Sequence, residues 1–278
     1  MVLTKEFNNG IKVHALQTGT VTVKKEHFKY SGRGLLRFLK IILSNKWANE
    51  MPIWTWVIET TKGNYLIDTG ESIDFYNPAH FKVKTEDYIY RKMLKFSITR
   101  DQEIDQQLKN IGLGTEKIDA VILTHMHLDH IDGIKYFPKA KFLISKVDWE
   151  NPSGIPKGRL PKWFKGEQIL CQKSNNGFRK SYSIANNLEL VSTPGHTVGH
   201  QSVLLKVDSY SILLAGDMTF NEYQLKNKIV GGINMNINKS IATIEQVQQF
   251  SKENNLIYLP SHDPNSGKRL MELKTTLC

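Results

Sequence analysis

Short runs of apolar residues recur along this chain, and four of them are each followed by a polar side chain of a metal-binding type. The four runs are VILT at 121–124, LELVSTPG at 188–195, ILLAG at 212–216 and LIYLPS at 256–261. Short, continuous apolar runs rich in β-branched and aliphatic residues are typical of buried β-strands. Rigid strands position the side chains that follow them, so the pattern predicts a site built on strand-end loops.

Three further segments complete an α/β pattern. WTWVIETTKGNYLIDT at 54–69 predicts a hairpin that turns around Gly63 and ends at Asp68. DQEIDQQLKNIGLG at 101–114 predicts a helix that stops near Gly112, and SIATIEQVQQFSKENN at 240–255 predicts another helix. The apolar face of this last helix consists of Ile241, Ile244, Val247 and Phe250. Each half of the chain thus supplies strands and covering helices.

Residues 24–50 combine helical spacing with a concentration of positive charge. One predicted helix face holds Leu35, Phe38, Leu39 and Ile42, and the opposite side holds Arg33, Arg37, Lys40 and Ser44. Two interpretations stay open: a surface helix packed on its own core, or a flap, introduced by SGRG at 31–34, that covers the site. A membrane-surface role is weaker, because a short helix of this kind binds only reversibly without a second anchor.

Tryptophans follow closely after this helix. Trp47, Trp54 and Trp56, together with Phe38, predict an apolar channel for an acyl chain, with plain core packing as the alternative. Phe38 and Trp47 are therefore candidate substrate-binding residues.

Length and composition indicate one globular domain over 1–278, since 40% of the 278 residues are hydrophobic and 23% are charged. The longest apolar stretch, LLRFLKIIL, is far shorter than the ~20 residues of a membrane span, so no stable membrane insertion is expected. The start, MVLTKEFNNG, has no apolar signal region, which favours a cytoplasmic protein. Two cysteines, Cys171 and Cys278, indicate free thiols rather than a disulfide framework.

The net charge of +10 raises the question of nucleic-acid binding. Residues 24–46 alone hold seven basic residues against Glu26, which accounts for +6 of the +10. The rest of the chain is only mildly basic, so no nucleic-acid partner is predicted.

Seven potential metal ligands stand in one order along the chain. They are His125, His127, Asp129 and His130 in THMHLDH, followed by His196, Asp217 and His262. Imidazole nitrogens and carboxylate oxygens suit Zn²⁺ and its divalent neighbours, and this set is large enough for two ions. For THMHLDH alone, the alternative is a polar loop that happens to carry histidines. His200 is expected to be a hydrogen-bonded structural residue, and His14, His27 and His80 to be surface or packing positions.

The chain resembles the metallo-β-lactamase superfamily, whose HxHxDH motif is matched by His125–His130, and the likeness runs from LIDTG to the late SHD. The resemblance implies an αββα sandwich, with the 24–50 segment as an N-terminal helical insertion. It also implies two divalent ions, zinc first, with iron, manganese or cobalt as alternatives. In the implied arrangement Asp217 bridges the ions and Asp68 orients a ligand from behind, with a turn-forming role before Gly70 as the alternative for Asp68. The implied ligands of one ion are His125, His127 and His196, and those of the other are Asp129, His130 and His262.

Within the superfamily, glyoxalase II shares THxHxDH and GHTxGH but has its first motif near the N-terminus and a helical region after its last ligand. Here 124 residues precede His125 and 16 follow His262. This arrangement looks like that of the N-acyl homoserine lactonases, which have a long N-terminal portion, a late LPSHDP-like ending and a similar length. The expected activity is therefore quorum quenching by lactone opening, with a homodimer as a possible assembly.

In those lactonases a metal-bridging hydroxide attacks the lactone carbonyl, and the Asp that corresponds to Asp129 delivers a proton. Many of them have a Tyr three residues after the bridging Asp, where this chain has Phe220. Phenylalanine cannot donate a hydrogen bond, so either the metal alone stabilises the oxyanion or a neighbour such as Tyr223 substitutes.

Other functions stay open at this point. A glyoxalase II-like thioesterase or another ester hydrolase is the main alternative. A metallo-nuclease is disfavoured, because this sequence shows no additional domain of the kind expected in that branch. A non-catalytic metal-binding module is disfavoured, because it would have no need to keep all seven ligands.

Overall fold

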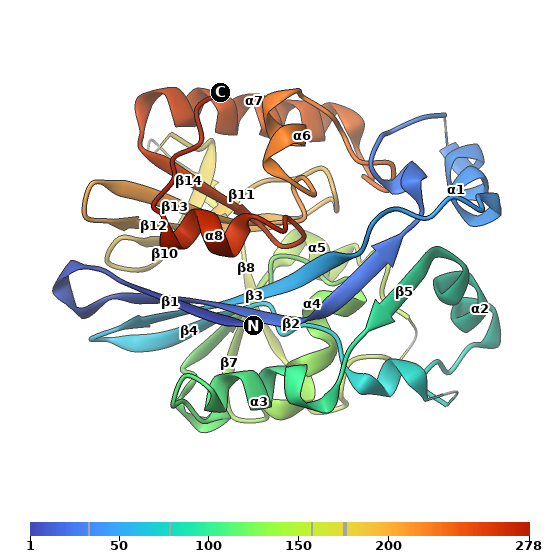
Figure 1. Ribbon diagram of the computed structural model, residues 1–278, viewed down its shortest axis with the longest axis horizontal. Coiled ribbons are helices and arrows are strands. Elements are labelled where there is room, and N and C mark those ends of the chain that lie inside the picture. Colours follow the sequence, from blue (N-terminus) through green and yellow to red (C-terminus); the bar gives the residue numbers. More distant parts are fainter. Residues whose placement is uncertain (33, 78, 157, 175–176) are drawn as a thin grey trace.

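Two β-sheets lie face to face in the centre of the molecule, with helices on their outer sides (Figure 1). The computed structural model describes residues 1–32, 34–77, 79–156, 158–174 and 177–278. The first sheet has the order β1-β2-β3-β4-β6-β7-β8, with β5 paired to β2. Its strands are β1 (Val2–Glu6), β2 (Lys12–Val23), β3 (Met51–Thr60), β4 (Gly63–Ile67), β5 (Leu94–Ser97), β6 (Ala120–Ile122), β7 (Lys141–Ser145) and β8 (Gly166–Ile169).

The second sheet has the order β14-β13-β12-β11-β10-β9. Its strands are β9 (Gln172–Lys173), β10 (Lys180–Ala185), β11 (Leu188–Ser192), β12 (Gln201–Val207), β13 (Tyr210–Gly216) and β14 (Leu256–Pro260). β12 is antiparallel to both β11 and β13, and β14 is parallel to β13. β11, β13 and β14 therefore run in the same direction and end at the same edge of the sheet.

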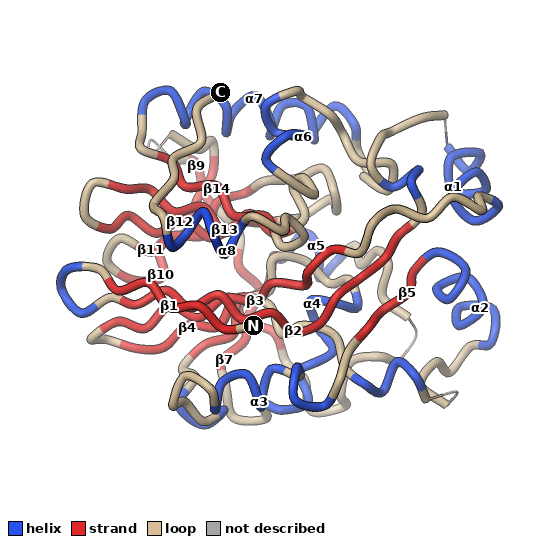
Figure 2. Tube along the Cα trace, viewed as in Figure 1, coloured by secondary structure: helices blue, strands red, loops and turns tan. Residues whose placement is uncertain are grey.

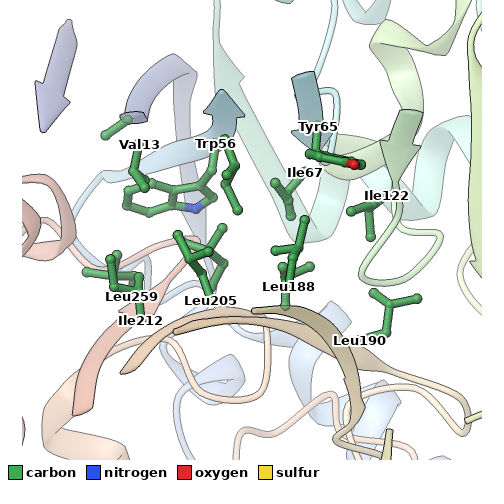
Figure 3. Packing of buried hydrophobic residues seen from close by; sticks show 14 of the residues in the cluster. Val13, Trp56, Tyr65, Ile67, Ile122, Leu188, Leu190, Leu205, Ile212 and Leu259 are labelled. Atoms are coloured by element: carbon green, nitrogen blue, oxygen red, sulfur yellow. The ribbon is translucent and has the colours of Figure 1, made fainter. Parts of the chain in front are cut away.

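The layer between the sheets is apolar and closely packed (Figure 3). Side chains of the first sheet, such as Trp56 and Ile122, meet side chains of the second, such as Leu205 and Leu259. Burial of this much apolar surface is the main force that holds two sheets together, at about 25 cal/mol per Å².

Helices cover the outer faces of both sheets (Figure 2). Ile104 and Leu108 of α3 (Ile104–Lys109) pack on the first sheet, and Ile244, Val247 and Phe250 of α7 (Ile237–Glu253) pack on the second. The others are α1 (Gly34–Leu43), α2 (Lys84–Met93), α4 (Leu128–Ile131), α5 (Lys146–Glu150), α6 (Glu222–Lys226) and α8 (Ser266–Met271). None of the helices described has the length and hydrophobicity needed to cross a bilayer.

The α/β sandwich predicted from the sequence is confirmed. β3 and β4 form the expected hairpin, and each of the four predicted apolar strands is found. The helix expected over 101–114 is shorter, because a turn at 100–102 precedes α3. Gly112 lies past its end with a φ of +76°, a conformation that favours glycine.

The face of α1 that points inward differs from the prediction. Arg37, expected on a solvated face, is buried and donates from Nη1 to the Asn234 carbonyl at 2.7 Å. Leu39, expected to face inward, is 50% exposed. The hydrophobic periodicity misleads here because nearly the whole helix is apolar and does not single out one face. The inner side instead carries Arg37, whose guanidinium has a carbonyl partner there. Arg33 and the side chain of Leu35 lie outside the described residues.

Candidate metal centre

All seven candidate ligands meet at one end of the sandwich, because each follows the end of a strand. His125, His127, Asp129 and His130 lie in the loop after β6 and in the short α4. His196, Asp217 and His262 follow β11, β13 and β14, the three strands of the second sheet that end at the same edge. The centre is thus formed jointly by the two sheets.

The first group of ligand atoms consists of three imidazoles and one carboxylate. His127 Nδ1 lies 3.0 Å from His125 Nε2 and 2.9 Å from His196 Nε2. Asp217 Oδ2 lies 3.9 Å from His125 Nε2 and 3.5 Å from His196 Nε2. A tetrahedral ion with bonds of about 2.1 Å separates its ligands by about 3.4 Å, which is close to these distances.

The second group shares Asp217 with the first. Asp217 Oδ1 lies 3.4 Å from His130 Nε2 and 3.3 Å from His262 Nε2. Asp129 adds its carboxylate, with Oδ2 3.4 Å from His262 Nε2. The two oxygens of Asp217 therefore face different groups, as a bridging carboxylate requires.

The residues present fit a pair of divalent ions. His130 Nε2 and Asp217 Oδ1 are buried and have no hydrogen-bond partner among the described residues. A buried polar atom without a partner costs about 1–3 kcal/mol, so both atoms call for a group that the protein itself does not supply. The donor set of imidazole nitrogens and carboxylate oxygens suits Zn²⁺ and similar ions.

Burial and charge set the protonation of the ligands. Burial and the imidazole of His130 hold the pKa of His125 well below its usual range, and burial lowers the pKa of His127 to about 4. Burial opposes protonation of His130 too, but Asp68, Asp217 and Asp129 outweigh it and raise the pKa of His130. In the absence of metal, the carboxylates thus draw positive charge onto an imidazole.

Hydrogen bonds from behind orient the ligands. Asp68 Oδ2 lies 2.7 Å from His130 Nδ1 and accepts from the Thr124 hydroxyl at 2.8 Å, while Asp68 Oδ1 accepts from the Thr124 amide. His262 Nδ1 donates to the Pro52 carbonyl at 2.9 Å, which leaves Nε2 as the lone-pair nitrogen that faces the centre. The structure thus places Asp68 directly behind His130.

The loop that carries His196 is fixed by residues that sequence reasoning did not single out. Asp148 accepts from the Thr197 hydroxyl and from the Gly199 amide, both at 2.7 Å. His200 is fully buried, and its Nε2 accepts from the Asp217 amide at 3.1 Å. That nitrogen is therefore occupied, which agrees with the expected structural role of His200.

Gly216, next to Asp217, has a position that only glycine fills without strain. Its φ is +57°, and a Cβ there would lie 2.7 Å from His200 Nε2 and 2.9 Å from Thr124 Oγ1. The close approach of β13 to these side chains explains why the strand ends in Ala-Gly.

An apolar cavity of about 370 Å³ opens above the centre. Its lining includes His127, Asp129, Asp217 and His262. Its other lining residues are Val21, Val23, His27, Phe38, Glu86, Ile89, Tyr90, Met93, Leu94, Leu128, Ser153, Gly154, Phe220, Ile233 and Met235. A mostly apolar cavity with a few convergent polar groups is the usual form of a small-molecule site.

Of the four side chains predicted near the substrate, two line the cavity. Phe38 comes from α1, and the Phe220 ring packs against that of Phe28 in a tilted arrangement, with 4.9 Å between ring centroids. Tyr223 is 65% exposed on α6 and does not line the cavity, so the expectation that its hydroxyl replaces the missing one is corrected. Trp47 does not line it either; its ring contacts the ammonium groups of Lys24 and Lys95, which lie 3.5 and 4.1 Å from the ring centroid.

Sequence reasoning also missed residues of the cavity wall. Trp54 and Trp56, offered as channel residues, are buried in the core between the sheets. His27, expected at a surface or packing position, is buried in the cavity wall. α2 contributes Tyr90 to the wall, and the Tyr90 hydroxyl donates to the Gly154 carbonyl at 2.6 Å. The polar sequence of α2, KTEDYIYRKM, carries no signal for this role.

Behind the centre, Glu71, His80 and Asp132 form another group with metal-binding side chains. The guanidinium of Arg159 pairs with Asp132 and lies 3.4 Å from Glu71, so a cation of the protein already occupies this group. We interpret it as a buried ion-pair cluster.

The sandwich and its histidine- and aspartate-lined centre define the class of protein. Residues 48–169 match the model of the Metallo-beta-lactamase superfamily, and the chain thus carries a metallo-β-lactamase domain. The resemblance inferred from HxHxDH is confirmed.

The similar proteins point to one branch of that superfamily. The chain is 25% identical over 255 residues to an N-acyl homoserine lactonase of Bacillus thuringiensis, covering 89% of this chain and 96% of that protein. It is 23% identical over 270 residues to the N-acyl homoserine lactonase AttM of Rhizobium radiobacter, covering 92% and 94%. A solved N-acyl homoserine lactone hydrolase with N-hexanoyl-L-homoserine at its metal centre shares the fold, with a TM-score of 0.72, 19% identity and coverage of 92% and 94%.

Proposed function

We propose that this protein is a metal-dependent hydrolase that opens the lactone ring of N-acyl homoserine lactones with two zinc ions. The observation that carries the proposal is Asp217, whose two carboxylate oxygens face two separate groups of ligands at the floor of an apolar cavity. The curated relatives with this activity match along nearly their whole length. Polar reacting groups at the floor and apolar walls above suit a polar ring that bears an acyl chain.

When bound, the two ions supply an activated water and polarise the lactone carbonyl. The protein's part is to hold the centre rigid and to keep bulk water away from it. His125, His127 and His196 would hold one ion, Asp129, His130 and His262 the other, with Asp217 between them. Because most of these side chains are buried, their charges act with little screening by solvent.

Asp129 is suited to move a proton at the leaving oxygen. It lines the cavity, and its carboxylate is more exposed than that of Asp217. We propose that Asp129 takes a proton from the attacking water and gives it to the ring oxygen as the carbon–oxygen bond breaks. The products are then a carboxylate and a free alcohol on one open chain.

The 24–50 segment serves as the flap over this cavity. α1 follows β2 and precedes β3 in the chain, and it brings Phe38 to the cavity wall. Arg37 attaches the helix to the Asn234 carbonyl by a hydrogen bond. Apolar contact with Phe38 favours substrates whose acyl chain is long enough to reach it.

The decisive experiment is a pH-indicator assay of metal-defined protein with acyl homoserine lactones, thioesters and phosphodiesters. We expect rapid proton release with the lactones alone, at two zinc ions per chain. Asp217→Asn and His130→Ala should each lose metal and activity together, since each removes a ligand. Preferred hydrolysis of thioesters or phosphodiesters, or full activity of either variant with both metals retained, would refute the proposal.

A further inference from the structure

The outer face of α1 is an apolar stripe open to solvent. Leu36, Leu39 and Leu43 are 71%, 50% and 75% exposed and lie on one side of the helix, with Lys40 among them. Tyr88 and Ile89 of α2, a helix in contact with α1, are 60% and 40% exposed. Single exposed apolar residues are ordinary, but several on two touching helices mark a surface that meets an apolar partner.

The same part of the molecule holds most of its net positive charge. Residues 24–50 and 82–95, named here the α1–α2 lobe, contain twelve basic and four acidic residues, a net +8 of the +10 of the chain. Its exposed lysines are Lys25, Lys29, Lys40, Lys46, Lys82, Lys84, Lys92 and Lys95. The lobe forms one end of the molecule, as Figure 1 shows.

We propose that the α1–α2 lobe docks on the surface of a bilayer that contains anionic lipids. Exposed leucines on a short helix enter the boundary between headgroups and acyl chains, and lysines beside them pair with anionic headgroups. A single short helix binds only weakly, but α2 supplies a second contact from a neighbouring element, which provides the second anchor.

Charge separates this partner from the other candidates. A second copy of the chain, placed about a two-fold axis, sets the basic lobe against itself and brings like charges together. A nucleic acid complements the lysines but leaves the leucines without an apolar partner. An anionic bilayer complements both features.

The lobe also borders the cavity, which gives the docking a consequence for substrate access. The inner side of α1 contributes Phe38 to the wall, and α2 contributes Ile89, Tyr90 and Met93. The outer face of α1 carries the stripe, so a docked molecule has its cavity wall beside the lipid surface. Amphiphilic substrates dissolved in the bilayer are then close to their site.

Vesicle sedimentation of the full-length protein tests the docking without any measure of activity. We expect binding to phosphatidylcholine vesicles with about one third phosphatidylglycerol, and at least tenfold weaker binding to pure phosphatidylcholine. Raising the salt from about 0.1 M to about 1 M should release the protein, because the Debye length falls from about 10 Å to about 3 Å. The double variant Leu36→Ser with Leu43→Ser should bind at least tenfold more weakly.

A matched control is the double variant Leu170→Ser with Leu277→Ser, since these leucines are 47% and 71% exposed but lie outside the lobe. It should bind vesicles like the wild type, and both variants should keep the wild-type melting temperature. Equal binding by the two double variants, or equal binding to both lipid compositions, overturns the proposal. The stripe is assigned to a second copy of the chain instead if the wild type does not bind vesicles and light scattering shows that it is a dimer. In that case the double variant Leu36→Ser with Leu43→Ser should be a monomer.

Discussion

A single hydrogen bond decides whether a buried histidine in this centre can bind a metal. His262 uses Nδ1 to donate to the Pro52 carbonyl, which frees the Nε2 lone pair for an ion. His200 also lies beside the centre, with its ring centroid 5.2 Å from that of His125, but its Nε2 accepts from the Asp217 amide. The residue type is the same in both cases, and the partner on one nitrogen sets the role of the other.

His200 gives a prediction about pH. Burial lowers its pKa to about 3, against about 6.5 in the unfolded chain, so the unfolded chain binds the proton more readily and stability falls as the pH drops below about 6.5. At pH 5 the loss from this group is about 2 kcal/mol.

His200→Gln keeps an acceptor for the Asp217 amide but cannot take up a proton. We expect the metal-free variant to lose about 2 kcal/mol less than the metal-free wild type between pH 7 and pH 5 in urea unfolding. Parallel pH profiles of the two proteins would contradict the prediction.

Phe220 gives a second prediction at this scale. It lines the cavity near His262, with 5.9 Å between ring centroids, and no hydroxyl is present on its ring. Phe220→Tyr should raise kcat for acyl homoserine lactones roughly tenfold or more, because one added oxyanion donor is worth about 10²–10³ in rate when well placed.

The control for this change is Phe220→Leu measured with the same acyl homoserine lactones, because leucine alters the wall without adding a donor. A gain in kcat with both variants would assign the effect to cavity shape. No gain with Phe220→Tyr would mean that the ions alone stabilise the developing charge.

At the level of elements, α1 has two faces with different tasks. The inner face holds Arg37 against the Asn234 carbonyl and brings Phe38 to the cavity, while the outer face carries the exposed leucines. Helical periodicity locates such a helix, but it cannot choose the inner side when both sides are apolar.

Phe38 leads to a prediction about chain length. Phe38→Ala removes apolar wall area, so kcat/KM should fall for long-chain lactones by about tenfold and hardly at all for short ones. Trp47→Ala serves as the comparison, because Trp47 lies outside the cavity lining and should affect all chain lengths alike. A uniform loss with Phe38→Ala would show that the flap does not contact the acyl chain.

At the level of the whole molecule, the metal centre joins the two sheets. His125, His127, Asp129 and His130 come from the first sheet, and His196, Asp217 and His262 come from the second. Any ion bound between them holds the halves of the sandwich together, so metal binding and folding are linked.

Metal removal should therefore lower the melting temperature. At a free zinc concentration about 100 times the Kd, binding adds about 2.7 kcal/mol, which for a chain of this size corresponds to roughly 5 °C. Calorimetry with and without a chelator measures the shift. Asp217→Asn should show a much smaller shift in melting temperature. An equal shift in that variant would argue against Asp217 as a ligand shared by the two groups.

The sequence by itself determined the strands that precede the ligands, the β3–β4 hairpin and the set of seven ligand side chains, whereas the αββα sandwich was implied by the family resemblance. These features depend on local patterns: continuous apolar runs define strands, and a ligand next to a strand end is placed wherever that end lies. The meeting of His125 with His262 was inferred through the resemblance, because spacing alone does not bring residues 137 positions apart together.

The tertiary structure alone decided which side chains face the cavity. Tyr90 and His27 reach it, whereas Tyr223 and Trp47 do not, and none of the four has a sequence pattern that separates it from the others. The inner side of α1 was settled in the same way, by the carbonyl of Asn234 that accepts from Arg37. The direction of a side chain depends on contacts with segments far away in the chain, and such contacts exist only once the two sheets have packed.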